Sequence, residues 1–575
     1  MYRLRRNPRL IPIVLTAFLS LNGSSQQPPA EIPPPTIRVT THMVLVDVVV
    51  TDKQGNPVPG LRAEDFALEE NGKSQKIVAV TTPPQNEPAA LPPGIYSNRA
   101  QFRSPGGPIT VMLLDVINTA FSDQAYARRQ MLSFVRDQYK PGQRMAVFTL
   151  TGSLNVVQDF TSDPQVLYLA LQRFRPEPQH FANAGQATTS AANDPTGSSS
   201  VAALDASTAP QSDTTSTLSP AIAAQVSAAQ AALQGFQDAQ VAYAQEQRTV
   251  LTLQALNSLG RILGGLPGRK NVIWVTGNLP FSLIPENRNM SEAELEENLP
   301  SLNTRRVGEH SAGNYAATFR AMHGDDIRET AARLASAQVA IYPVDARGLS
   351  ISTSSDAQET MREMARETGG RAYVNQNEIK LGVQRAFEDV AATYTLGYYP
   401  ENKKFDGKYR SIKVKVKKDG LELQNRRGYY AIDPMQIKGY SAQQEVASAL
   451  NDAAPSTLVG FSARVRPPAA NSTPGKLGID FLVDASTLST EDTSSGKRLN
   501  VAFYATVFSP QGKMIVERSQ RVDQSFNADV YKQIVEKGLL LHMDMDPQAG
   551  NNQLRLAVQD NQTGLVGTID APLGQ

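Results

Sequence analysis

The sequence contains no cysteine among its 575 residues. This absence excludes disulfide bonds, thiol catalysis, cysteine-based metal sites and a lipid anchor on a cysteine. Small secreted domains usually depend on disulfides, so an exported chain without them needs ordinary hydrophobic cores for its stability. For an exported chain, the missing cysteine therefore indicates a bacterial envelope or secreted protein built from domains of normal size, about three or four of them at this length.

An excess of charge of one sign is also missing, because 56 Lys and Arg residues stand against 55 Asp and Glu residues. Drawing a whole protein onto nucleic acid or an anionic membrane requires a large positive excess. We therefore expect that the protein does not bind nucleic acid and that its partners are not polyanions.

Patterns of catalytic residues are absent as well. No HExxH, GxSxG or P-loop pattern occurs, and the two histidines closest in sequence, His310 and His323, would point roughly 220° apart around a helix. Histidines on separate segments are typical of a protein surface rather than of a zinc site or a hydrolase triad. The sequence thus predicts no catalytic residues and a protein that is not an enzyme.

Long hydrophobic runs are confined to the N-terminus, where four arginines precede an apolar run at 10–21. A basic start and a run of this length are typical of a secretory signal, and too short to span a bilayer comfortably. We expect a signal peptide at 1–25 with cleavage near Ser25, a linker at 26–35, and a periplasmic or secreted protein without an integral membrane span. An uncleaved signal that anchors the chain to the membrane is the alternative.

A small β segment is expected at 36–82. Val44, Val46, Val48 and Val50 would share one face of a strand, and the pair Asn71-Gly72 favours a hairpin turn. A second linker, rich in proline and asparagine, is expected from residue 82 to 108.

From residue 105 to 393 the pattern changes to strands separated by helices, which predicts a mostly parallel sheet covered on both faces. One short connection favours an antiparallel hairpin at the edge. The expected fold of this region is six-stranded and doubly wound, with strands at 109–114, 144–150, 154–160, 271–276, 339–344 and 371–374.

An insertion interrupts this region. Residues 181–219 are dominated by Ala, Ser, Thr, Gln and Asp, which is typical of disorder. Residues 220–263 favour one long helix, whose first turns could dock a partner or serve as a solvated spacer.

Two further β regions follow. Strands at 394–432 are expected to pair with the segment 36–82, because each is too small to be stable alone. Residues 440–575 predict a C-terminal β-sandwich. We therefore expect a multidomain chain of α/β plus all-β type, with the α/β domain inserted between two β-sandwich segments.

The stretch ITVMLLDVINT, from Ile109 to Thr119, is the strongest indication of a site. A buried strand ends in an aspartate, and ligands of open α/β sheets collect at the carboxyl ends of the strands. The sequence predicts partner contacts at this edge from Asp115, Asn118, Thr119, Thr276 and Asp345.

Over Thr36 to Ala431 the chain resembles bacterial von Willebrand factor A-related proteins of the acidobacterial type. The resemblance rests on the segments VTDKQGNPVPGLRAEDFALEENGKSQKI, LLDVINTAFSDQ, GRKNVIWVTG, YPVDARGL, ARETGGRAYVNQN and YTLGYYP. It implies a von Willebrand factor type A domain, a fold that mostly binds proteins, often through a metal held by an Asp-x-Ser-x-Ser loop.

This chain departs from that implied metal-binding pattern. Asp115 and Thr119 match the loop, but Ile117 replaces the first serine and Gly277 stands where an aspartate is expected after the fourth strand. The threonine-bearing second loop cannot be matched. Because hard cations require oxygen ligands, we expect no cofactor and weak or no Mg²⁺ binding, with Asp115, Thr119 and, as a further option, Asn118 as candidate metal ligands.

Three functions remain open from the sequence. The first is an exported, non-enzymatic protein-binding, scaffold or adhesion protein that acts through the α/β domain. The second is an envelope enzyme that uses strand-end carboxylates such as Asp115, Asp345 and Asp356. The third is recognition by the C-terminal sandwich, whose segment SPQGKMIVERSQRVDQSF has the pattern of an exposed hairpin.

Overall fold

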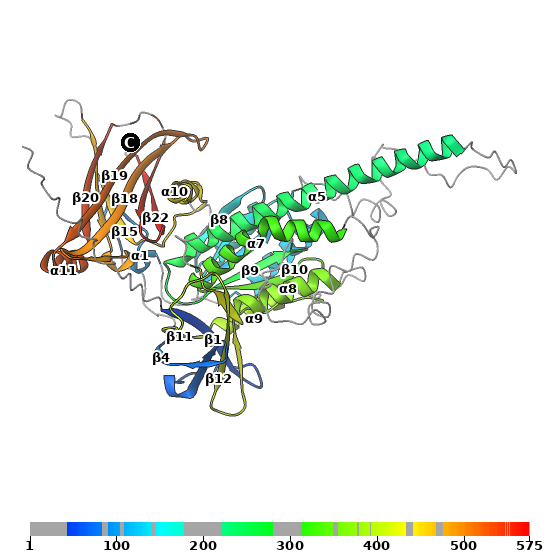
Figure 1. Ribbon diagram of the computed structural model, residues 1–575, viewed down its shortest axis with the longest axis horizontal. Helices are drawn as coiled ribbons and strands as arrows, with labels where there is room; N and C mark the ends of the chain where they lie inside the picture. Colours follow the sequence, from blue (N-terminus) through cyan, green and yellow to red (C-terminus); the bar gives the residue numbers. More distant parts are fainter. Residues whose placement is uncertain are drawn as a thin grey trace, which may run out of the picture. The chain divides into compact units, whose positions relative to one another are not determined.

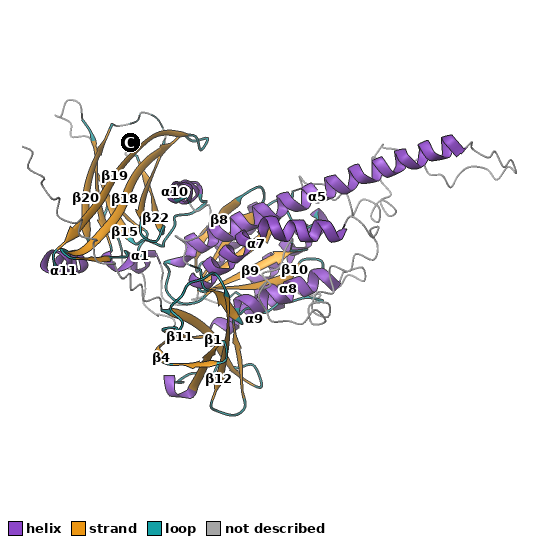
Figure 2. Ribbon diagram, viewed as in Figure 1, coloured by secondary structure: helices purple, strands orange, loops and turns teal. Residues whose placement is uncertain are grey.

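The structure is a computed structural model, shown in Figures 1 and 2. The expected signal peptide, the linker at 26–35 and the insertion at 181–219 lie outside the described residues. Every described residue belongs to one compact unit, 40–575. The described residues are 43–82, 90–103, 109–139, 144–177, 220–279, 312–348, 355–375, 379–391, 393–432, 441–466, 475–546, 548, 550 and 552–573.

A mostly parallel sheet forms the centre of the α/β domain, residues 109–391. Its strands are β6 (Ile109–Asp115), β7 (Arg144–Leu150), β8 (Leu154–Thr161), β9 (Lys270–Thr276) and β10 (Val339–Asp345). They lie in the order β10-β9-β6-β7-β8, and only β8 runs antiparallel to its neighbour. Every residue of β6, β9 and β10 is buried, as expected for strands covered on both faces.

The prediction of six strands is wrong in its last member. The segment 371–374 forms only an isolated parallel bridge, in which Tyr373 N donates to Pro343 O at 2.8 Å and Asp345 N donates to Tyr373 O at 3.0 Å. The segment is a short connection between α8 (Ser355–Thr368) and α9 (Ile379–Ala391), so the chain runs beside β10 for too few residues to form a strand.

Helices cover both faces of this sheet (Figure 2). On one face α2 (Phe121–Asp137), α3 (Pro164–Arg173) and α9 pack against alternate residues of the strands, including Met112 and Ile273. On the other face α5 (Pro220–Gly264), α7 (Ala312–Ser336) and α8 pack in the same way. The long helix α5 takes part through its C-terminal turns, where Leu256, Leu259 and Leu263 are buried in the core.

The N-terminal β module consists of the described strands within 43–82 and 393–432. β1 (Val44–Asp52) pairs antiparallel with β11 (Thr393–Tyr398) on one side and with β13 (Leu421–Asn425) on the other. Because strands from both segments share two sheets and one hydrophobic cluster, neither segment forms this module alone. The remaining strands are β2 (Phe66–Glu70), β3 (Lys73–Gln75), β4 (Ile77–Thr81), β12 (Tyr409–Val416) and β14 (Gly428–Tyr430).

The C-terminal β module consists of two antiparallel sheets that share one hydrophobic cluster. One sheet has the order β20-β16-β15-β5; the other has the order β17-β18-β21-β22, with β19 paired to β18. Their bounds are β5 (Ile95–Ser97), β15 (Phe461–Arg466), β16 (Leu477–Val483), β17 (Glu491–Thr493), β18 (Gly496–Phe508), β19 (Met514–Phe526), β20 (Leu539–Met545), β21 (Gln553–Asp560) and β22 (Val566–Pro572), with helices α10 (Ala442–Asn451) and α11 (Ala528–Lys537).

Strand β5 corrects the expected linker at 82–108. It pairs with β15, and the adjacent side chain of Asn98 fixes this segment to the C-terminal β module. Asn98 Nδ2 donates to Ser456 O at 2.8 Å, and Phe461 N donates to Asn98 Oδ1 at 2.8 Å. The proline-rich composition therefore did not indicate this strand, because β15, with which it pairs, lies far along the sequence.

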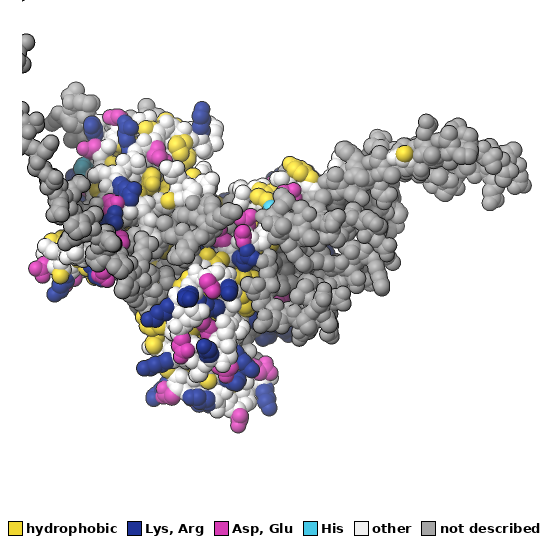
Figure 3. Space-filling view, in the orientation of Figure 1, with side chains coloured by type: hydrophobic (Ala, Val, Ile, Leu, Met, Phe, Trp, Pro, Cys, Tyr) yellow, Lys and Arg dark blue, Asp and Glu magenta, His cyan; other side chains and the backbone are white. Residues whose placement is uncertain are grey.

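Two surface properties bear on partners. Both signs of charge are interspersed over the visible part of the N-terminal β module, around β1, β4 and β12, so no basic stripe for a polyanion is present on this face (Figure 3). Among the described residues, no helix is both long and apolar enough to cross a bilayer.

Candidate functional site

The carboxyl edge of the α/β domain, where β6, β7, β9 and β10 end, places Asp115 at the end of the central strand β6. Its carboxylate accepts hydrogen bonds from the backbone N–H of Asn118 at 3.1 Å and from Asn118 Nδ2 at 2.9 Å. It also accepts from Trp274 Nε1 and from Thr276 Oγ1, both at 2.9 Å. Four donors of the protein itself therefore surround one carboxylate.

The hydrogen-bond donors to the Asp115 carboxylate are all neutral groups. Asp115 is 2% exposed. Burial raises the pKa of its carboxyl to about 6, although hydrogen bonds from Asn118, Thr276 and Trp274 act in the opposite direction. The ionised form is thus stabilised only by neutral donors.

Gly277 allows the loop after β6 to pack against the end of β9. Gly277 N donates to Thr119 Oγ1 at 2.9 Å. A Cβ atom at position 277 would lie 3.2 Å from Asn118 O and 3.4 Å from Thr119 Cα, so any side chain there would press on the loop. The position that carries an aspartate in the implied metal-binding pattern is therefore also a packing position in this chain.

Helix α5 completes the arrangement. Asn118 Nδ2 donates to Thr252 Oγ1 at 3.2 Å, and Thr252 is fully buried. Nothing in the sequence pattern connected Thr252 to this site, because α5 follows the variable insertion. We refer to Asp115, Asn118, Thr119, Thr252, Trp274, Thr276 and Gly277 as the Asp115 network.

Asp345 lies apart from the Asp115 network. At the end of β10 it accepts from Arg347 Nε at 2.8 Å and from Arg347 Nη2 at 2.9 Å, and it is almost fully buried. β9 separates β10 from β6, so the two strands are roughly 10 Å apart. The side chain of Asp356, the third expected carboxylate, lies outside the described part.

Of the predicted site residues, the structure brings Asp115, Asn118, Thr119 and Thr276 together and leaves Asp345 in a separate pair. All five side chains are buried. Their named polar atoms are occupied by other groups of the chain, so a direct contact with a partner would require the loop to open. Their assignment as partner-binding residues stays a prediction.

The donor set does not fit a divalent cation. Around Asp115 the neighbours present N–H and O–H hydrogens, whereas Mg²⁺ requires oxygen lone pairs directed at it. Thr119 Oγ1, the second candidate ligand, already accepts a backbone hydrogen bond. Within the described ranges, no group of three or more His, Cys, Asp or Glu side chains is arranged to hold a metal.

The exposed residues of the carboxyl edge differ from the predicted ones. Phe121 begins α2 directly after the loop and is 54% exposed, although it is a large aromatic side chain. Asn278 after β9 and the turn Gly152–Ser153 after β7 are also exposed. These residues, rather than the buried network, are available to another protein.

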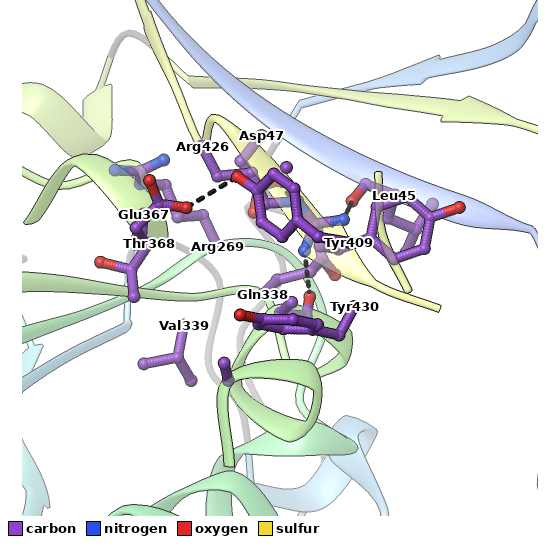
Figure 4. Close-up of a pocket in the computed structure, with 14 residues that line it drawn as sticks. Leu45, Asp47, Arg269, Gln338, Val339, Glu367, Thr368, Tyr409, Arg426 and Tyr430 are labelled. Atoms are coloured by element: carbon purple, nitrogen blue, oxygen red, sulfur yellow. Dashed lines mark hydrogen bonds between the residues drawn. The ribbon is translucent and has the colours of Figure 1, made fainter. Parts of the chain in front are cut away.

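A small cavity lies between the α/β domain and the N-terminal β module (Figure 4). In Figure 4, Tyr409 points to Glu367, to which its hydroxyl donates at 2.7 Å. Gln338 Nε2 donates to Asp47 Oδ1 at 2.8 Å across the same junction. Of these four lining residues, Asp47 and Tyr409 belong to the β module and Gln338 and Glu367 to the α/β domain, and no sequence pattern indicated this grouping.

The cavity also contains two buried guanidinium groups. Arg426 donates to Ala335 O and to Leu45 O, each at 2.8 Å, and Arg269 donates to Tyr342 Oη at 2.8 Å. The volume of about 30 Å³ accommodates one or two water molecules. The cavity is therefore a polar junction between modules rather than a pocket for a sizeable ligand.

Known proteins similar to this chain are found among the solved structures. No protein-family model and no curated protein matches the chain. An aerotolerance-related membrane protein from Bacteroides fragilis is similar at 13% identity and a TM-score of 0.23, over 49% of this chain and 98% of that chain. BatB from Bacteroides thetaiotaomicron is similar at 13% identity and a TM-score of 0.23, over 50% of this chain and 99% of that chain.

A von Willebrand factor type A protein from Catenulispora acidiphila is similar at 9% identity and a TM-score of 0.23, over 69% of this chain and 82% of that chain. The sheet has four parallel strands, the antiparallel edge strand β8 and helices on both faces, so the α/β domain is a three-layer α/β fold.

Proposed function

We propose that this chain is an exported, non-enzymatic scaffold or adhesion protein whose α/β domain binds another protein at its carboxyl edge without a metal ion. The Asp115 network is the observation that carries the proposal. Donors of the protein itself bind the Asp115 carboxylate, whereas a metal-dependent edge would leave this carboxylate free to bind the ion. Export is proposed from the basic and apolar N-terminal sequence.

Phe121 is the proposed anchor of this contact. Aromatic side chains contribute strongly to protein interfaces because they bury a large apolar area with few rotatable bonds. The exposed Ser122 follows Phe121 in the sequence, and the exposed Asn278 follows β9 at the same edge of the sheet, which fits an apolar centre with a polar rim. Binding through Phe121 needs no change in the Asp115 network.

The buried carboxylates support a non-enzymatic role. Acid and base chemistry on a substrate requires carboxyl groups that reach the reacting atoms. Asp115 and Asp345 are both buried, and each accepts hydrogen bonds from its own neighbours in the chain.

Site-specific photo-crosslinking tests the proposal. Phe121 is replaced in the full chain by a photoreactive benzoylphenylalanine, and the protein is irradiated in an envelope extract of the source organism with excess chelator. Leu169 on α3, which is 49% exposed, provides the matched control. We expect a discrete protein adduct from position 121 that persists without divalent ions and is absent from position 169.

Two outcomes would contradict the proposal. Equal adducts from both positions, or none from position 121, would remove Phe121 as an anchor. An adduct that forms only when Mg²⁺ or Mn²⁺ is supplied would show that binding at this edge depends on a metal after all.

A further inference from the structure

Strand β19 is a long, exposed edge strand. It extends over 13 residues, Met514–Phe526, and within the described ranges it pairs with β18 alone. Figure 1 shows β18 and β19 as two long, curved strands side by side. The free edge of such a strand presents unpaired backbone N–H and C=O groups to any strand that can align with them.

Apolar side chains accompany this edge. Val516 and Val522 are partly buried against the core and lie opposite Val507 and Val501 of β18. At the start of the strand, Met514 and Ile515 are 48% and 46% exposed. A strand added at this edge would therefore cover apolar area as well as backbone groups.

The charges of β19 are complementary to themselves in one antiparallel register. In a continuous sheet with two-fold symmetry, each residue meets one on the same face of the second copy. When the axis passes through Ser519, Glu517 meets Arg521 of the second copy, and this pair occurs twice. Val516 meets Val522 in the same register, also twice.

Neighbouring registers bring like charges together. An axis through Arg518 or through Arg521 places that arginine against its own copy, and an axis through Gln520 places Glu517 against Asp523. Two residues that lie directly opposite each other stabilise the pairing of their strands when their charges are opposite, and destabilise it when their charges are alike. The strand therefore selects the register centred on Ser519 over its immediate neighbours.

We propose that β19 is a homodimer interface, at which a second copy of this chain adds its own β19 antiparallel in the register centred on Ser519. The two sheets then form one continuous sheet. Arg518, which pairs with Asp546 at 3.5 Å within its own chain, meets the neutral Gln520 of the second copy. This interface is independent of the carboxyl edge of the α/β domain.

Sedimentation velocity of the full chain over a range of micromolar concentrations tests the proposal. We expect a monomer–dimer equilibrium that Glu517→Arg weakens by about tenfold or more, because two attractive pairs become repulsive. The double variant Glu517→Arg with Arg521→Glu exchanges the charges and is expected to restore the dimer. Glu536→Arg, the same change at an exposed position of α11, is expected to leave the equilibrium unchanged.

Circular dichroism of each variant identifies any loss of fold, and Arg521→Glu alone provides a second way to break the same pairs. A monomer at every concentration would overturn the proposal, as would a dimer that Glu517→Arg does not weaken. A dimer broken by Asp523→Arg but not by Glu517→Arg would overturn this register, because an axis through Val522 pairs Arg521 with Asp523 instead.

Discussion

Asp115 is a buried carboxylate that neutral donors hold in place, and this arrangement makes stability depend on pH. Its pKa of about 6 in the folded chain exceeds the ordinary value of 3.8. A carboxyl with a raised pKa contributes stability that is fully present below the unfolded pKa and is lost as pH rises through the folded pKa. Most of the contribution is therefore expected at pH 4, and it is gone at pH 7.

We predict that the free energy of unfolding of the wild-type α/β domain falls by roughly 2 kcal/mol more between pH 4 and pH 7 than that of Asp115→Asn. Urea unfolding followed by fluorescence measures this difference, because Trp274 is the sole tryptophan of the chain and lies in the core of this domain. An identical pH dependence in both proteins would show that Asp115 is not the titrating group.

The residues of the Asp115 network were only partly predictable. Asp115, Asn118, Thr119 and Thr276 end or follow strands, so the sequence placed them at one edge. The direction of a side chain depends on packing from distant segments, which no local pattern reveals. Trp274 was therefore missed as a donor although its strand was predicted.

Among the elements, α8 ends in two glycines that have different roles. Gly369 adopts a φ of +80°, the left-handed conformation that often ends a helix, and Gly370 N donates to Ala365 O at 2.8 Å as in a Schellman motif. Gly370 has a different role, since a Cβ atom there would lie 1.9 Å from Ile341 O. Close approach to β10, rather than backbone conformation, requires this glycine.

Gly370→Ala is therefore expected to lower the free energy of unfolding of the α/β domain by about 3 kcal/mol, because backbone atoms must move to admit the methyl group. Gly152→Ala is the control, since a Cβ atom at this exposed turn meets nothing within 4 Å. Trp274 fluorescence in urea measures both variants. A loss below about 1 kcal/mol at position 370 would contradict the close packing of this segment against β10.

Elements defined by hydrophobic periodicity were easier to predict than elements defined by distant partners. The strands of the parallel sheet are continuous apolar runs, and their ranges nearly match those expected. β5 and the bridge at Tyr373 are too short to show a period. Their identity depends on β15 and β10, which lie elsewhere in the sequence.

On the scale of the whole molecule, buried polar contacts connect the modules. Arg261 of α5 binds Asp452 through Nε at 2.6 Å and Nη2 at 2.8 Å, and this pair ties the α/β domain to the C-terminal β module. Gln338 and Asp47 form a corresponding contact to the N-terminal β module. The sequence indicated the modules through composition, but not these contacts, because their partners are separated by almost two hundred residues or more.

The central claim is that the carboxyl edge of the α/β domain is closed by the chain's own donors and does not hold a divalent cation. Isothermal titration of the full chain with Mg²⁺ and with Mn²⁺ tests it most directly. We predict no saturable binding up to millimolar concentrations, and no difference between wild type and Asp115→Ala. Micromolar binding that disappears in Asp115→Ala would contradict the account and show that this loop is a working metal site.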